Sequence, residues 1–180
     1  MTHLLIVDDE PHVLSALRRM LLNAAALPAL PDPQLTACTS PVKALEHVAN
    51  HHVDLVISDY RMPVMDGVSF LTRVKELQPD TARIILSACA DMEGIVRAIN
   101  EAGIFRFVSK PWSDAELKAI VMQVLAHREL LLENRRLADQ VRCQKGVISQ
   151  QQLELARLEA ESPGITRVRW TEDGGVLLED

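Results

Sequence analysis

The sequence predicts an α/β fold: a doubly wound, five-stranded parallel sheet, followed by a long C-terminal helix that forms a coiled coil and by a short β-hairpin tail. Short apolar runs alternate with longer amphipathic stretches as far as about residue 127, which is the pattern of strands and helices in turn. A helix-compatible stretch then extends to residue 161, and residues 162–180 contain turn-forming residues. We therefore expect a main domain over residues 1–127, a coiled-coil extension over 128–161 and a tail over 162–180.

The elements of the main domain follow one another in a regular order. The apolar runs predict strands at residues 4–7, 35–38, 55–57 (running on to Asp59), 82–86 and 105–108. Apolar residues at helical spacing predict helices at residues 13–21, 41–49, 68–77 and 92–102. A loop with Pro28, Pro31 and Pro33 separates the first helix from the second strand. Right-handed crossovers would place the helices on both faces of a parallel sheet.

Composition limits the classes of function. The chain has 180 residues, 48% of them hydrophobic, which suffices for one well-buried domain and an appendage. Its formal net charge of -6 argues against direct binding to DNA. Cys38, Cys89 and Cys143 lie far apart without metal-ligand spacing, so neither a disulfide framework nor a zinc site is expected. We find neither a signal peptide nor an apolar run long enough to span a membrane, and we expect a cytoplasmic protein without membrane attachment.

Polar residues follow four of the predicted strands. Asp8 and Asp9 follow the first strand, and the third, fourth and fifth are followed by Asp59, Ser87 and Lys110. The carboxyl ends of parallel strands meet at one edge of the sheet, where ligands bind. Clustered carboxylates repel one another unless a cation neutralises them, and oxygen ligands of this kind suit Mg²⁺. With the charge neutralised, one carboxylate can act as a nucleophile toward phosphorus.

These residues resemble a known family. The segment from Ile57 to Gly67, with sequence ISDYRMPVMDG, is similar to the phosphoacceptor segment of the receiver (CheY-like) domains of two-component response regulators. Asp8-Asp9, Ser87-Ala88 and Lys110-Pro111 match the other motifs of the family in order, so the resemblance covers roughly residues 3–127. The resemblance implies a signalling protein whose only catalysis is its own phosphorylation and autodephosphorylation.

The resemblance also implies a role for each matched residue. Asp59 would be the phosphoacceptor, and Lys110 would pair with the phosphoryl group. Ser87 and Phe107 would form the hydroxyl and aromatic switch pair. The Mg²⁺ ligands would be Asp8, Asp9, Asp59 and the backbone carbonyl of Arg61, and Pro111 would follow a cis peptide. A sensor histidine kinase would supply the phosphoryl group in a phosphorelay.

Other functions fit the sequence less well. A phosphohydrolase of the haloacid dehalogenase type needs a second aspartate two residues after the nucleophile, where this chain has Arg61. The segment from Ile104 to Trp112 is similar to receiver domains attached to cyclic-di-GMP phosphodiesterases, but no His-Asp or Gly-Tyr-Pro motif follows residue 127. A helix-turn-helix is not apparent either, which disfavours a transcription regulator. We therefore expect output through an unidentified partner protein, while a phosphate sink stays open.

The extension begins with a capping box, Ser113-Asp114-Ala115-Glu116. In a heptad register, position a holds Asn134, Val141, Ile148 and Leu155, and position d holds Leu130, Leu137 and Leu158. This pattern predicts a homodimeric coiled coil over residues 128–161, with a single helix that folds back on its own domain as the alternative. The register is interrupted by Gly146 and by polar residues at His127, Gln144 and Gln151. Arg128, Arg135, Arg136 and Arg142 lie among glutamates and predict a solvated helix face.

The tail has the pattern of a β-hairpin. Ser162-Pro163-Gly164 ends the helix, and the runs 165–170 and 176–178 flank a turn with Gly174 and Gly175. An isolated hairpin is marginal in water, so we expect it to dock through Trp170, with a frayed end as the alternative.

Overall fold

The computed structural model describes residues 2–22, 33–88 and 102–161, with only part of the side chains after residue 146. The chain separates into two compact units, Met1–Leu132 and Glu133–Asp180. Four predicted features lie outside the described residues: the proline loop, Cys89, the helix predicted at 92–102 (apart from its last residue) and the tail hairpin. The side chain of Ile148 is not described either.

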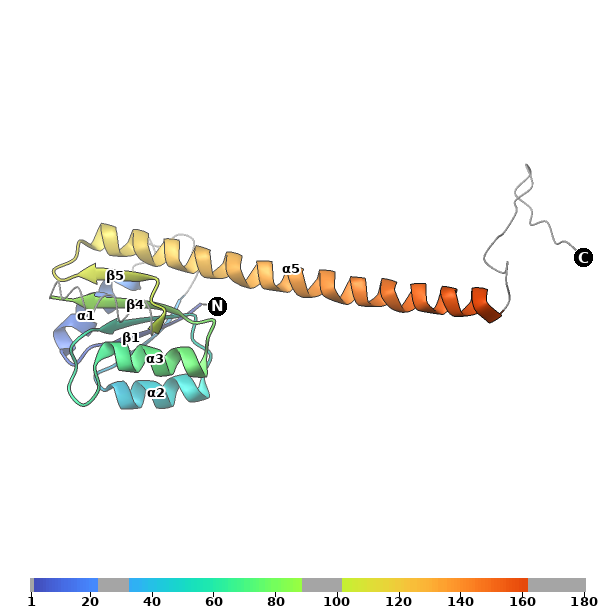
Figure 1. Cartoon of the computed structure of the whole chain (residues 1–180). Helices are drawn as coiled ribbons and strands as arrows, with labels where there is room; N and C mark the ends of the chain where they lie inside the picture. Colours follow the sequence, from blue (N-terminus) through green and yellow to red (C-terminus); the bar gives the residue numbers. More distant parts are fainter. Residues whose placement is uncertain (1, 23–32, 89–101, 162–180) are drawn as a thin grey trace, which may run out of the picture. The chain divides into compact units, whose positions relative to one another are not determined.

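The first unit is built on a parallel five-stranded sheet (Figure 1). Its strands are β1 (His3–Val7), β2 (Gln34–Cys38), β3 (Leu55–Asp59), β4 (Ala82–Ser87) and β5 (Arg106–Ser109), in the spatial order β2-β1-β3-β4-β5. All four neighbouring pairs are parallel. The predicted fold class is confirmed, and the boundaries differ by one or two residues. The fifth strand lies one residue further along the chain than the apolar run indicated.

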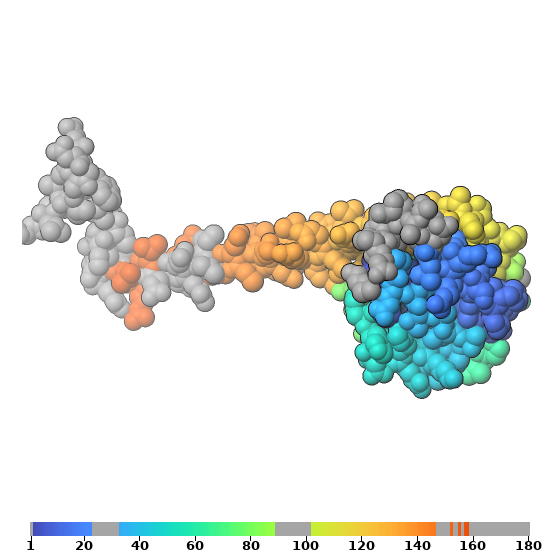
Figure 2. Space-filling model, turned by 180° about the vertical axis from the view of Figure 1, so that it is seen from behind, coloured from blue at the N-terminus to red at the C-terminus, as the bar shows by residue number. Residues whose placement is uncertain are grey.

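Helices cover both faces of this sheet. On one face, the buried side chains of α1 (Pro11–Leu21) and of the first turns of α5 (Asp114–Glu161) pack with alternate residues of the strands. On the other face, α2 (Pro41–Asn50) and α3 (Gly67–Leu77) pack on the remaining strand residues. The strands β1, β3 and β4 carry apolar side chains on both sides because both faces are covered. In Figure 2, α1 (blue) and β2 (light blue) lie side by side.

Local sequence explains where the helices begin. Proline occupies the first turn of α1 and α2, where its missing amide hydrogen costs nothing. The Asp66 side chain caps α3 by accepting a hydrogen bond of 2.7 Å from the Ser69 amide. At the start of α5 the Ser113 hydroxyl oxygen accepts from the Glu116 amide at 3.5 Å, as the capping box predicts.

Helix α5 continues through Gly146 and ends at Glu161, next to the predicted Ser-Pro-Gly stop. A glycine inside a helix costs about 1 kcal/mol relative to alanine, which long helical flanks readily offset. Among the described helices, none combines the length and apolar character needed to cross a membrane.

Candidate functional site

The site lies at the carboxyl ends of β1 and β3, which are neighbours at the centre of the sheet. Strand order reverses here, because β2 lies on one side of β1 and β3 on the other. Asp8 follows β1 and is 1% exposed, and Asp59 ends β3 and is 7% exposed. Two carboxylates are therefore held nearly out of water on adjacent strands.

Lys110 joins these two carboxylates. Its ammonium group lies 2.8 Å from Asp8 Oδ2 and forms a second ion pair with Asp59 Oδ1. The Lys110 amide donates to the Ser87 carbonyl at 2.8 Å, which fixes the start of the lysine segment beside the end of β4. The peptide bond between Lys110 and Pro111 is cis, as predicted.

Backbone amides hold the remaining carboxylate oxygens. Asp8 Oδ1 accepts from the Glu10 amide at 2.9 Å, and Asp59 Oδ2 accepts from the Arg61 amide at 2.8 Å. Each carboxylate is thus oriented by one backbone donor and one ammonium group, so little reorganisation is needed before it reacts.

Gly67 sets the backbone of the acceptor loop. An added Cβ at this position would lie 2.0 Å from the Asp59 carbonyl oxygen. The Gly67 amide donates to the Tyr60 carbonyl at 2.9 Å, which closes the loop between β3 and α3. Only glycine allows this approach of α3 to the acceptor strand.

Burial and charge act in opposite directions on the ionisable groups. Burial raises the pKa of Asp8, and its hydrogen bonds from Lys110 and the Glu10 amide offset only part of this effect. Burial alone would lower the pKa of Lys110, but hydrogen bonds and charges from Asp59 and Asp8 outweigh it, so that the pKa is raised. Lys110 therefore stays protonated, and additional positive charge near Asp8 would stabilise its ionised carboxylate.

The donor set fits Mg²⁺. Among the described residues, no group of three or more histidine, cysteine, aspartate or glutamate side chains lies close enough together to hold a metal ion. Mg²⁺ does not require such a group, because it usually binds through one or two carboxylates and keeps several waters. Asp8 and Asp59 already share one cation, the Lys110 ammonium, and provide hard oxygen ligands.

The other predicted residues occupy different surroundings. The Asp9 side chain is exposed. Ser87 ends β4 and is 3% exposed, whereas Phe107 on β5 is half-buried against the core on the α2–α3 side. Ser87 pairs with Ser109 in the sheet, and Phe107 pairs with Ile85. The structure thus brings Asp8, Asp59 and Lys110 into direct contact and places Ser87 and Phe107 on the two adjacent strands.

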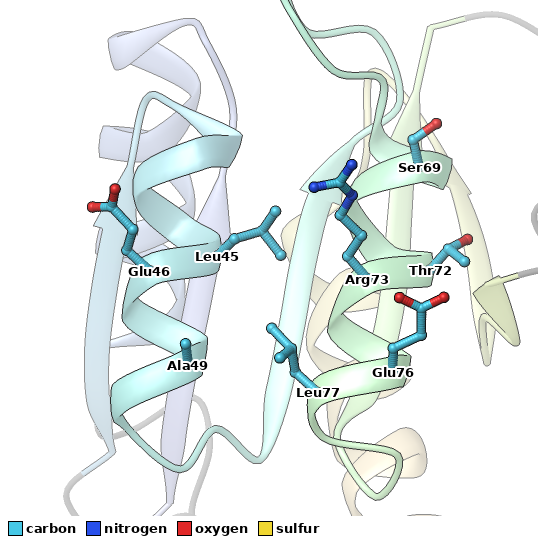
Figure 3. Close-up of a pocket in the computed structure, with 8 residues that line it drawn as sticks. All are labelled: Leu45, Glu46, Ala49, Ser69, Thr72, Arg73, Glu76 and Leu77. Atoms are coloured by element: carbon cyan, nitrogen blue, oxygen red, sulfur yellow. The ribbon is translucent and has the colours of Figure 1, made fainter.

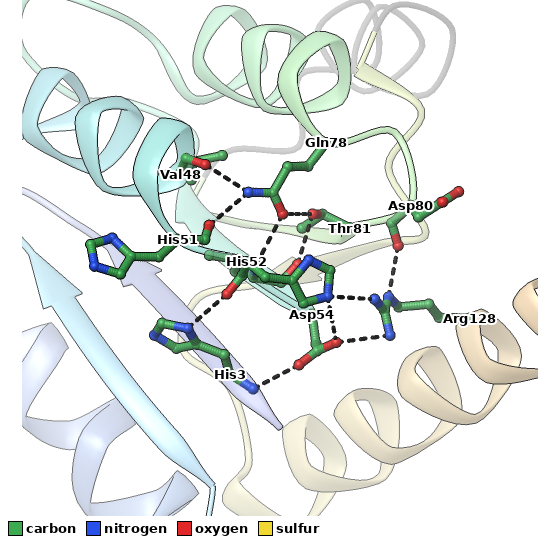
Figure 4. A network of polar contacts seen from close by, with 10 residues as sticks. His3, Val48, His51, His52, Asp54, Gln78, Asp80, Thr81 and Arg128 are labelled. Atoms are coloured by element: carbon green, nitrogen blue, oxygen red, sulfur yellow. Dashed lines mark hydrogen bonds and ion pairs between the residues drawn. The ribbon is translucent and has the colours of Figure 1, made fainter. Parts of the chain in front are cut away.

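A second polar cluster lies at the opposite, amino-terminal edge of the sheet (Figure 4). Arg128 Nη1 forms an ion pair of 2.9 Å with Asp54 Oδ1, and the two side chains are only 13% and 15% exposed. Arg128 Nε donates to the Asp80 carbonyl at 2.7 Å, and Asp54 Oδ2 accepts from the His3 amide at 2.8 Å. The prediction that Arg128 belongs to a solvated face is wrong, although Arg135, Arg136 and Arg142 are exposed.

Sequence reasoning missed this cluster because its partners are far apart in the chain and charge spacing along one helix cannot reveal them. His51 and His52 take part in packing nearby. The His51 ring stacks on His47 at 4.3 Å, and the His52 carbonyl bonds with His3 Nδ1 at 2.7 Å.

A surface hollow of about 880 Å³ lies between α2 and α3 (Figure 3). Its lining mixes apolar and charged side chains: Leu45, Glu46, Ala49, Ser69, Thr72, Arg73, Glu76 and Leu77. Neither Asp8 nor Asp59 lines it, so the hollow is separate from the candidate site.

Known proteins are similar to this chain in sequence and fold. Residues 4–122 match the family model of the response regulator receiver domain. The hydrogenase transcriptional regulatory protein HoxA of Bradyrhizobium diazoefficiens is 35% identical over 122 residues, which cover 68% of this chain and 24% of HoxA. The regulatory protein AtoC of Escherichia coli K12 is 36% identical over 135 residues, covering 74% of this chain and 27% of AtoC. The chain thus spans about a quarter of the length of these curated relatives.

Solved structures agree with the sequence comparisons. The signal receiver domain of an HD domain-containing protein from Pseudomonas fluorescens Pf-5 is 37% identical with a TM-score of 0.64, covering 71% of this chain and 97% of that chain. A CheY-like receiver domain protein from Methanospirillum hungatei JF-1 has a TM-score of 0.65 at 22% identity, covering 72% of this chain and 97% of that chain, and shows the fold alone. The family match, the fold and the acidic strand-end site agree: this chain belongs to the response regulator receiver domain family of two-component systems.

Proposed function

We propose that this chain is a phosphorylation-controlled signalling protein whose acceptor is Asp59. The observation that carries the proposal is the pair of buried carboxylates, Asp8 and Asp59, joined by the Lys110 ammonium. A sensor histidine kinase is the proposed donor, since receiver domains interact with such kinases, and phosphotransfer from an ATP-using kinase implies a cytoplasmic location.

In the proposed transfer, an Asp59 carboxylate oxygen forms a bond to phosphorus while the bond between phosphorus and the donor histidine nitrogen breaks. The histidine nitrogen keeps the electron pair and takes up a proton. Lys110 neutralises charge on the phosphoryl oxygens, and the Arg61 amide holds the orientation of the carboxylate. Bound Mg²⁺, held by Asp8, Asp59 and the carbonyl of Arg61, would supply further neutralisation of the phosphoryl oxygens.

Two residues on the adjacent strands would read the modified state. The Ser87 hydroxyl is the proposed donor to a phosphoryl oxygen, a bond that the unmodified protein lacks. Phe107 is the proposed partner of this switch because it lies on β5, which pairs with the strand that Ser87 ends. Asp9 is the fourth proposed ligand of the metal, beside Asp8, Asp59 and the carbonyl of Arg61.

The experiment uses acetyl phosphate and Mg²⁺ with intact-mass measurement. Wild type should gain the mass of one phosphoryl group, labile to base, and Asp59→Asn should gain none. Asp66→Asn is the matched control, because asparagine also caps a helix and the variant should label as wild type does. A folded wild type without mass gain, or equal labelling of Asp59→Asn, would overturn the assignment.

We also propose that α5 forms a homodimeric coiled coil over residues 128–161. Six large apolar side chains on this part of the helix are between 42% and 63% exposed: Leu130, Leu131, Leu137, Val141, Leu155 and Leu158. Five of them occupy the predicted a and d positions. Output would pass from this dimer to an unidentified partner protein.

A further inference from the structure

One face of α5 packs against the hydrophobic core of the first unit. Leu117 and Val121 are fully buried, Val124 is 2% exposed and the Arg128 side chain is 13% exposed. The spacing of four, three and four residues places these side chains on one stripe of the helix.

The exposed apolar residues lie on another face. Each residue advances an α-helix by about 100°. Counted from Val124, Leu130, Leu137 and Val141 lie about 100–140° around the helix axis. Their exposed fractions are 63%, 48% and 47%. The predicted dimer face is thus turned by about 100° or more from Val124, away from the stripe that packs on the sheet.

Arg128 fixes the helix where this stripe ends. Its guanidinium binds the Asp54 carboxylate and the Asp80 carbonyl, and its Nη2 lies 3.3 Å from His52 Nε2 (Figure 4). Releasing the helix would take this cation away from the mostly buried Asp54 carboxylate and leave only the His3 amide and His52 beside it, which is unfavourable. The contacts lie at the amino-terminal edge of the sheet, whereas Asp59 ends β3 at the other edge. Phosphorylation at Asp59 therefore does not have to break them.

A second copy of this chain is the occupant that the exposed face fits. The 3-4 spacing of its apolar residues is that of a coiled coil, and Asn134 at position a can pair with its own equivalent across a two-fold axis. An isolated helix is marginal in water, so pairing along this face would stabilise residues 133–161.

We infer that α5 dimerises constitutively, through the helix face that carries Leu130, Leu137 and Val141, so that phosphorylation changes the surface of an existing dimer and not its assembly. The inference rests on the proposed function for its phosphorylation arm, while the docking surface stands on the helix alone.

The test combines light scattering with intact mass on the same samples of the full chain. Wild type should have the mass of a dimer across a dilution series both before and after treatment with acetyl phosphate and Mg²⁺, with less than a threefold change in the dissociation constant. Leu137→Lys should be monomeric yet still labelled. Asp139→Lys adds the same lysine at an exposed outer position, 60% exposed in its pair with Arg142, and should stay dimeric.

Each outcome decides the inference. A wild type that is monomeric in both states, or a Leu137→Lys variant that is still dimeric, would refute the docking face even if Asp59 labels normally. A monomer that dimerises only when labelled would refute constitutive assembly. A dimer that does not label would refute the phosphoacceptor and leave the docking face supported.

Discussion

Removing the guanidinium of Arg128 should destabilise the receiver unit far more than removing an exposed arginine of the same helix. In Arg128→Met the aliphatic stem is kept, but Asp54 loses its ion pair with Arg128 and the Asp80 carbonyl loses a donor. Breaking one partner of a buried pair costs about 3–5 kcal/mol. About one-seventh of each side chain is exposed, and Asp54 keeps the His3 amide and His52 Nε2, which lies 3.3 Å from its Oδ1. We therefore expect a smaller loss of about 2–3 kcal/mol.

The assay is urea unfolding followed by circular dichroism, with Arg136→Met as the matched control. Arg136 forms a pair of 3.7 Å with Glu133, and both side chains are more than half exposed, so its loss should cost less than about 0.5 kcal/mol. In a double-mutant cycle with Asp54→Asn, the coupling energy should exceed about 1 kcal/mol. Equal costs for the Arg128 and Arg136 variants, or additive effects in the cycle, would refute the reasoning.

Three further predictions concern the glycines, the histidines and the acceptor loop. Gly67→Ala should lower the unfolding free energy by at least about 2 kcal/mol and reduce labelling by acetyl phosphate, because the added Cβ meets a backbone oxygen. Gly146→Ala should instead raise the unfolding free energy by about 1 kcal/mol in the same assay, because nothing lies within 4 Å of the new Cβ. Burial and two neighbouring imidazoles lower the pKa of His47 from its ordinary value of 6.5, so the unfolded chain takes up the proton first and stability should fall as the pH drops below about 6.5. This dependence of the unfolding free energy on pH should be weaker in His47→Gln, and an unchanged dependence would contradict this cause. Val64 has a φ of 72° and is 93% exposed, so Val64→Asn should raise the unfolding free energy by about 1 kcal/mol, and a loss of stability would argue against strain at this position.

Much of the fold could be predicted because the strand runs are strongly apolar. The runs beginning at Leu4, Leu55 and Ala82 are buried on both faces, which leaves a continuous apolar signal in the sequence. The fifth strand was misplaced by one residue because its side chains are only partly buried, so apolar residues mark its limits poorly. Helix α5 was followed correctly across Gly146 to the Ser-Pro-Gly stop.

The site could be located but not fully described. Parallel strands bring their carboxyl ends to one edge whatever the loops do, and this geometry joined Asp8, Asp59 and Lys110. Sequence could not show that Asp8 is buried while Asp9 faces solvent, since that depends on how the chain turns after β1. Nor could it show the contact of Arg128 with Asp54, which only the path of α5 across the sheet creates.

Strand β3 starts at the residue after Asp54 and ends at Asp59, so a single segment of five residues joins the two polar clusters. All five residues are buried, and β3 is hydrogen-bonded on both sides. A strand of this length spans about 16 Å and has almost no freedom to bend. Any substitution that shifts the register of β3 would therefore displace Asp59 and, at the same time, break the contact between Asp54 and Arg128 of α5. In a library of variants selected separately for labelling and for thermal stability, β3 should be the segment where the two selections reject the same substitutions.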